Sequence, residues 1–275
     1  MPIAHPLAIE YLTVAGADPV AEIEAAAAAG LDAVGLRVLA PLGLALAHPV
    51  VGNAARIRDI RRATERTGVG ILDVELITLT AASRPADFAP AIETAAEIGC
   101  RFVQVVSEDP VEARAAANFA AVCAAAGAFG MRAALEFMRW RSVRTIEDAA
   151  RLVRRAGHPG GGIVLDTLHL SRSGGTPAAV AAVPPELLCY LQLCDAPARL
   201  PPDEDILAEA RGGRLYPGEG GLWLDELLDA LPAGIPISIE VPGAMAAQAS
   251  AAERAARAAA ATRTYLAGYA ARRTR

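Results

Sequence analysis

The feature that most constrains the fold is an alternation, repeated eight times, of short apolar runs with longer segments rich in Ala, Arg and Glu. Short, nearly continuous apolar runs are typical of strands covered on both faces, and the segments between them have helical composition. The predicted strands are 7–12, 33–38, 71–79, 102–106, 132–137, 162–166, 189–193 and 235–241. The predicted helices are 19–29, 53–67, 89–98, 112–129, 145–156, 177–182, 222–231 and 244–265.

Eight such units in about 250 residues predict an α/β fold, a single (β/α)8 barrel of parallel strands and outer helices. We expect it to occupy residues 1–275 as one domain, with 196–202 as a long loop. The alternative is a doubly wound sheet. The first turn argues against it, because it offers one glycine, Gly16, and no G-x-G-x-x-G phosphate motif.

Composition excludes several classes of protein. The 26 Lys and Arg residues are outnumbered by 31 Asp and Glu residues, so we expect no nucleic-acid partner. No run of about 18 apolar residues occurs, and the start of the chain lacks the pattern of a signal peptide, so we expect no membrane association and a cytoplasmic location.

Two groups of residues are interpreted as structural. Four cysteines, Cys100, Cys123, Cys189 and Cys194, lack the spacing of a metal site and are expected to be small buried hydrophobic residues. The arginines at the end of the chain, Arg272, Arg273 and Arg275, are expected to form a solvated tail.

Polar residues at the carboxyl ends of the last four strands mark the predicted site, because barrel enzymes carry their reactive groups there. Glu136, Asp166, Gln192 and Glu240 stand at or near these ends. Three converging carboxylates repel one another unless a cation or protons intervene. A divalent metal bound by these four residues resolves the conflict. Their oxygen ligands favour Mn²⁺, Co²⁺ or Mg²⁺, with Zn²⁺ as the remaining alternative.

Two further residues follow at an offset of three: His169 after Asp166, and Asp195 after Gln192. A histidine just past a strand end can titrate near neutral pH and act as an acid or a base. We therefore predict His169 to be catalytic, and Asp195 to bind substrate close to it.

Several of these motifs also form the basis of a family resemblance. Glu136, Asp166-x-x-His169, Gln192-x-x-Asp195, the segment 214–220 (RLYPGEG) and Glu240-Val-Pro resemble the xylose-isomerase-like TIM barrels. This superfamily contains sugar phosphate isomerases and epimerases, among them ketose 3-epimerases, and also inosose dehydratases and 3-dehydroshikimate dehydratases. Many members have His where this chain has Gln192, and the Gln form is similar to some bacterial 3-dehydroshikimate dehydratases.

The resemblance implies proton abstraction next to the carbonyl of a small polyhydroxylated substrate, with a metal-stabilised enediolate. It implies that Glu136 and Glu240 ligate the metal and also handle substrate protons. In a dehydratase, His169 becomes the preferred acid or base. The resemblance is compatible with a homo-oligomer, but no interface is recognisable in the sequence.

Three further residues are candidates for substrate binding. Arg214 lies in the loop before the last strand, and Arg141 follows the fifth strand, where a cation would suit an anionic substrate. On the third strand, Glu75 and Asp73 are both acidic, and Glu75 is expected to face the pocket.

Three functions are consistent with these residues. The first is a metal-dependent isomerase or epimerase, and the second, held nearly equal, is a dehydratase of the 3-dehydroshikimate or inosose type. The third is a non-catalytic sugar-binding barrel. It ranks last because a pocket without catalysis has no reason to keep three converging carboxylates.

Overall fold

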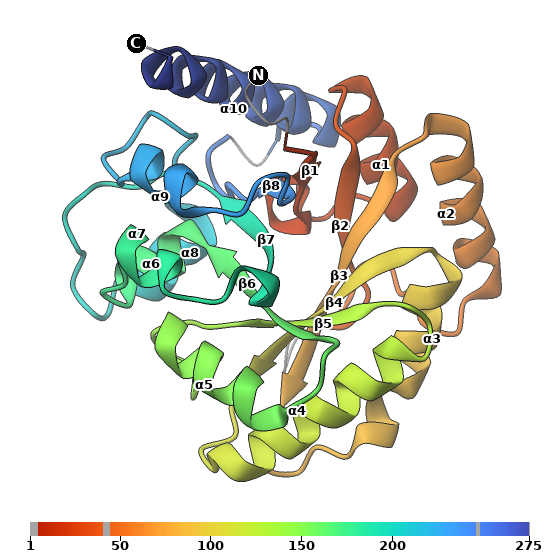
Figure 1. Ribbon diagram of the computed structural model, residues 1–275. Coiled ribbons are helices and arrows are strands. Elements are labelled where there is room, and N and C mark those ends of the chain that lie inside the picture. Colours follow the sequence, from red (N-terminus) through yellow and green to blue (C-terminus); the bar gives the residue numbers. More distant parts are fainter. Residues whose placement is uncertain (1–4, 41–44, 246–247, 275) are drawn as a thin grey trace.

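Eight parallel strands close into a barrel in sequence order, with β8 hydrogen-bonded to β1 (Figure 1). This computed structural model describes residues 5–40, 45–245 and 248–274. The predicted (β/α)8 fold is confirmed. The strands are β1 (Leu7–Ile9), β2 (Ala33–Arg37), β3 (Gly70–Leu79), β4 (Cys100–Ser107), β5 (Arg132–Glu136), β6 (Gly161–Asp166), β7 (Leu188–Leu193) and β8 (Ile237–Ile239).

Helices surround the strands, and the long α10 lies beside α1 (Figure 1). The helices are α1 (Pro19–Ala28), α2 (Ala54–Thr67), α3 (Ala89–Glu97), α4 (Glu112–Gly127), α5 (Ile146–Ala156), α6 (Thr167–Arg172), α7 (Pro177–Ala181), α8 (Ile206–Gly212), α9 (Leu224–Ala230) and α10 (Ala251–Arg273). Short 3-10 turns occupy Tyr11–Val14, Pro85–Phe88 and Pro185–Leu187.

Local chemistry explains where these helices begin and end. The Thr145 side chain accepts a hydrogen bond from the Asp148 backbone, and Asp148 returns one to the Thr145 backbone, which forms a capping box before α5. Gly157 ends α5 and Gly68 ends α2, both in the left-handed conformation that glycine adopts without strain. These signals made the boundaries of α2 and α5 predictable to within a few residues.

A layer of polar side chains lies in the barrel interior beneath the pocket, on the side of the amino ends of the strands. The hydroxyl of Tyr190 on β7 donates to Asp73 on β3, which is not a neighbouring strand, so both side chains point inwards. Asp73 and Glu10 are fully buried. Burial raises the pKa of Asp73 to about 7 and raises the pKa of Glu10 well above its ordinary value.

The two ends of the chain differ from the predicted elements. The first strand stops at Ile9 and a 3-10 turn follows, because the backbone N–H of Glu10 bonds to Ile239 and that of Thr13 turns back to Glu10. The last helix extends to Arg273, eight residues past the predicted end.

Arg272 and Arg273 are exposed, as the predicted solvated tail implies, but they lie in a helix and form ion pairs instead of a free tail. Arg272 forms an ion pair with Asp225 of α9 at 2.7 Å, and Arg273 pairs with Asp229 of the same helix. Both arginines belong to the last turn of α10, where cations also suit the helix dipole. Arg275 lies outside the described residues.

The four cysteines are free and buried, which confirms their interpretation as small hydrophobic residues. Burial raises the pKa of the Cys123 and Cys194 thiols to about 12, so they stay protonated at neutral pH. Among the described residues, no helix is long and apolar enough to cross a membrane.

The polar layer generates a stability prediction. A β-carbon on Gly35 would overlap the carboxyl oxygens of Glu10 and Asp73, so Gly35→Ala overpacks the barrel interior. We expect it to lower the free energy of unfolding by about 1–3 kcal/mol in urea denaturation at pH 7. Gly70→Ala is the control, because its β-carbon meets only the Asp32 carbonyl oxygen at 3.8 Å. Equal effects of the two substitutions would contradict this account of the interior.

Candidate active site

A cavity of about 320 Å³ opens at the carboxyl end of the barrel. Its walls combine acidic, basic and apolar side chains from several βα units. The polar and charged side chains that line it are Arg37, Glu75, Gln104, Glu136, Arg141, His169, Arg211, Arg214 and Glu240. Five of the predicted substrate-binding or catalytic carboxylates and cations therefore meet in one cavity with His169.

Asp166 ends β6 and also caps the first turn of α6. Its Oδ1 accepts the backbone N–H of His169 at 2.8 Å, and its Oδ2 accepts Arg214 Nη1 at 2.5 Å. Burial alone would raise the pKa of Asp166. The charge of Arg214 and the hydrogen bond from the His169 backbone N–H lower it to about 2. Asp166 is therefore an anion at neutral pH, held in a fixed orientation.

Arg214 connects Asp166 to Glu240. Its Nη1 lies 3.1 Å from Glu240 Oε2, and its Nε donates to the carbonyl of Ala210 in α8 at 3.1 Å. All three charged side chains are at most 4% exposed. Burial and the nearby Asp166 raise the pKa of Glu240 well above its ordinary value, although Arg214 opposes the shift. One guanidinium thus compensates two buried acidic residues.

Glu136, at the end of β5, faces the same space. Its Oε2 accepts a hydrogen bond from Gln104 Nε2 at 2.7 Å, and its Oε1 lies 3.5 Å from His169 Nε2. Burial and the negative charges of Glu240 and Asp166 raise the pKa of Glu136 well above its ordinary value. Its carboxyl group has more negative neighbours than a single guanidinium can neutralise.

His169 is 3% exposed and its ring packs edge-on against Trp140, with ring centroids 5.1 Å apart. Burial lowers the pKa of His169 to about 4, and Asp166 only partly opposes this shift. The imidazole is therefore neutral at pH 7. Its Nδ1 is buried and has no hydrogen-bond partner within the described part of the chain.

Gln192 on β7 is paired in register with Asp166 on β6 and with Ser238 on β8. Its side-chain oxygen and nitrogen are both buried and form no hydrogen bond with any described residue. An unpartnered buried amide costs free energy unless something absent from the protein chain satisfies it. The Gln192 amide, opposite Asp166 in the strand register, thus has no hydrogen-bond partner among the described residues.

The donor set suits a divalent cation. Glu136, Asp166 and His169 each offer one ligand atom, and these atoms lie within 4.8 Å of one another. Of the other two predicted ligands, Glu240 is not in this group and pairs with Arg214, and Gln192 has a buried amide oxygen without a partner among the described residues. Carboxylate, amide and imidazole donors are compatible with Mn²⁺, Co²⁺ or Zn²⁺. The predicted ligands Glu136 and Asp166 belong to this cluster, and His169 joins them.

Three of the four predicted substrate-binding residues line the cavity: Glu75, Arg141 and Arg214. Glu75 lines the cavity and accepts a hydrogen bond from Arg37 at 3.1 Å, whereas Asp73 stays in the barrel interior. Arg141 also lines the cavity and pairs with Glu108.

Asp195 does not line this cavity. Its carboxylate accepts backbone N–H groups of the following loop, from Ala196, Gly218, Gly220 and Leu222, at 2.8–3.1 Å. It thus orders the loop that follows Arg214, and its oxygens are already satisfied.

Sequence reasoning missed three residues of the cavity wall. Gln104 lies in the middle of the apolar strand β4, and a search for polar residues inside apolar strands would have found it. Arg37 ends β2 and gives the same kind of signal. Arg211 lies on α8 inside a long loop, where no periodicity marks it.

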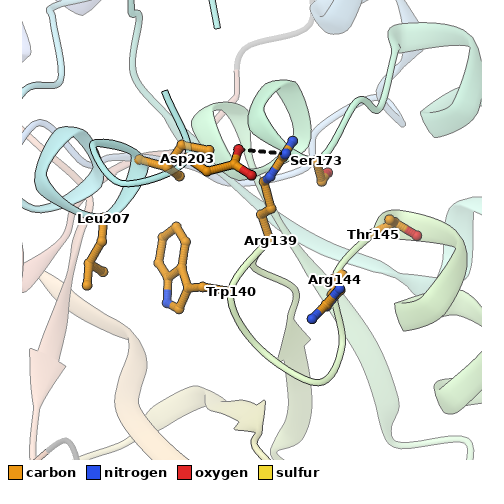
Figure 2. A pocket seen from close by; sticks show the side chains of 8 residues that line it. Arg139, Trp140, Arg144, Thr145, Ser173, Asp203 and Leu207 are labelled. Atoms are coloured by element: carbon orange, nitrogen blue, oxygen red, sulfur yellow. Dashed lines mark hydrogen bonds and ion pairs between the residues drawn. The ribbon is translucent and has the colours of Figure 1, made fainter. Parts of the chain in front are cut away.

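A second pocket of about 460 Å³ adjoins the cavity and shares Trp140 and Leu207 with it. Figure 2 shows Arg139 and Arg144 at this pocket, with Arg139 bonded to Asp203 at 2.7 Å. The side chains of Trp140 and Leu207 therefore line both the cavity and the adjoining pocket.

A model of the xylose isomerase-like TIM barrel family matches residues 23–265. The chain belongs to this family, which confirms the resemblance predicted from the strand-end motifs.

Two curated relatives are 3-dehydroshikimate dehydratases. The protein from Pseudomonas putida is 33% identical over 120 residues, which are 42% of this chain and 18% of that protein. The protein from Pseudomonas aeruginosa is 36% identical over 116 residues, which are 41% of this chain and 18% of that protein. The match therefore covers less than a fifth of the length of either relative.

Solved structures share the fold. A xylose isomerase-like TIM barrel/4-hydroxyphenylpyruvate dioxygenase fusion protein has a TM-score of 0.78 at 24% identity, covering 94% of this chain and 42% of that one. The IolI protein, whose structure contains zinc, has a TM-score of 0.80 at 18% identity, covering 96% and 99%. L-ribulose 3-epimerase has a TM-score of 0.73 at 17% identity, covering 98% and 97%. At these identities the likeness shows the fold alone.

The metal site generates a prediction. We expect Asp166→Asn and Glu240→Gln each to weaken Mn²⁺ affinity at least about 100-fold, because each removes a charged ligand from a buried site. Metal content after dialysis is measured by mass spectrometry, and circular dichroism verifies that the fold persists. Asp203→Asn, which changes a carboxylate of the adjoining pocket, serves as the control. Stoichiometric metal in both site variants would refute the assignment.

Proposed function

We propose that this protein is a divalent-metal-dependent dehydratase acting on a small hydroxylated carbonyl compound of the 3-dehydroshikimate type. The observation that carries the proposal is the convergence of donor atoms from Glu136, Asp166 and His169 within 4.8 Å of one another at the carboxyl end of the barrel. The two curated relatives support a dehydratase outcome over an epimerase outcome.

The proposed metal site consists of Glu136, Asp166, Gln192 and Glu240. A divalent cation bound there would polarise a substrate carbonyl oxygen and make the neighbouring proton more acidic. Asp166 is held in place by the His169 backbone N–H, and Gln104 fixes the orientation of Glu136. The site is therefore preorganised by hydrogen bonds outside the ligand set.

Dehydration breaks a C–H bond next to the carbonyl and a C–O bond one carbon further, and the hydroxyl leaves as water. The chain must therefore accept one proton and return one to the leaving hydroxyl. His169 lines the cavity, and its Nε2 lies 3.5 Å from Glu136 Oε1. These two groups are close enough to share the proton transfers.

An epimerase is the second candidate. It needs two groups that exchange a proton on opposite faces of one carbon. Glu136 comes from β5 and Glu240 follows β8, and both side chains line the cavity. This placement is the specific observation that favours epimerisation.

The proposal predicts the reaction of the Mn²⁺-loaded protein. With 3-dehydroshikimate, we expect ultraviolet absorbance from 3,4-dihydroxybenzoate, the product left after loss of one water. His169→Gln should lower kcat by about 10²–10⁴-fold, the usual contribution of a general acid or base. His48→Gln, which changes a partly exposed histidine beside Asp18, should leave kcat unchanged.

The same protein incubated with ketoses in D₂O tests the second candidate by proton NMR. Deuterium at the ketose α-carbon, without turnover of 3-dehydroshikimate, would establish the epimerase and contradict the dehydratase.

A further inference from the structure

The four arginines that line the cavity are not equally neutralised. Arg37 pairs with Glu75, Arg141 with Glu108, and Arg214 with Asp166 and Glu240. Arg211 also lines the cavity but forms no ion pair within residues 5–40, 45–245 and 248–274. Arg211 is an exposed residue, so its guanidinium stays solvated at the cavity wall and is available to pair with an anionic ligand.

Arg141 lines the same cavity as Arg211. Burial, and then the positive charge of Arg211, lower the pKa of Arg141. Glu108 contacts Nη1 of Arg141. The Nε of Arg141 is buried and has no hydrogen-bond partner among the described residues. Two guanidiniums that repel each other, one with a buried N–H unused, favour an anion between them.

The helix that carries Arg211 is firmly attached to the barrel. In α8, Glu209 accepts two hydrogen bonds from Arg172, at 2.7 and 2.6 Å, and the Arg172 side chain is 1% exposed. Arg214 Nε also donates to Ala210 of the same helix. Arg211 is therefore mounted on a fixed element, which reduces the entropy lost on binding an anion.

The remaining wall of the cavity is apolar. Leu76, Met138, Trp140 and Leu207 line it together with the charged groups. A volume of about 320 Å³ lies at the small end of ligand pockets, which span roughly 300–1,000 Å³. The space accommodates a compact ligand with a carbon face towards the apolar residues and polar groups towards the carboxylate cluster.

We propose that Arg211 and Arg141 form a carboxylate-binding subsite that selects small cyclic substrates bearing one carboxylate over neutral sugars of similar size. This inference rests on the proposed function, because it assigns a substrate class to the same cavity. It goes further in naming the residues that select the substrate, and neither residue is required to handle a proton.

The test compares two ligands that differ by one carboxylate. Isothermal titration measures binding of 3,4-dihydroxybenzoate and of catechol to the Mn²⁺-loaded protein. Both ligands carry the same pair of hydroxyls, so their contacts with the metal cancel in the comparison. We expect the wild type to bind the carboxylate at least about tenfold more tightly, since a charged hydrogen bond to arginine is worth that much.

Arg211→Gln should remove most of this preference, leaving a ratio below about threefold. Arg141→Gln should reduce it as well. Arg199→Gln is the matched control, because Arg199 is an exposed arginine on the same β7–β8 connection as Arg211 but does not line the cavity, and it should keep the full preference.

Each outcome separates the subsite from the proposed function. A preference that disappears in Arg211→Gln supports the subsite even if 3-dehydroshikimate is not turned over. A preference that survives unchanged in Arg211→Gln, or its absence in the wild type, overturns the subsite even if the dehydratase activity is present. In an active enzyme, Arg211→Gln should raise KM for 3-dehydroshikimate while kcat changes much less.

Discussion

The site is governed by the need to compensate acidic side chains buried at one end of a closed barrel. Glu136, Asp166 and Glu240 converge there, and each is at most 3% exposed. Arg214 supplies a single positive charge between Asp166 and Glu240, and the pKa of Glu136 stays strongly raised. The buried amide of Gln192 also has no partner among the described residues. A divalent cation would relieve both, because it adds charge and accepts the amide oxygen as a ligand.

The long connection between β7 and β8 is built around this constraint. It carries Arg214 into the carboxylate cluster and places α8 over the cavity, where Arg172 and Glu209 hold it. Asp195 orders the following loop by accepting its backbone N–H groups. Residues that the sequence grouped as one substrate-binding set thus have different tasks: Arg214 and Arg141 line the cavity, and Asp195 shapes the loop.

The barrel and much of the site were predictable because both follow short-range rules. Parallel strands place their carboxyl ends at one edge, so polar residues ending apolar runs identified Glu136, Asp166 and Glu240. Residues on loop helices follow no such rule. Arg211 reaches the cavity only because α8 folds back over it, and the partners of Arg272 and Arg273 on α9 depend on how α10 packs. Such contacts arise from tertiary packing, which periodicity does not encode.

Diffraction from Mn²⁺-loaded crystals, recorded at the manganese absorption edge, would test the central claim most directly. The account predicts an anomalous peak in contact with Glu136 and Asp166, with the Gln192 amide turned towards it. Crystals of fully loaded protein with no peak at this cluster would contradict it.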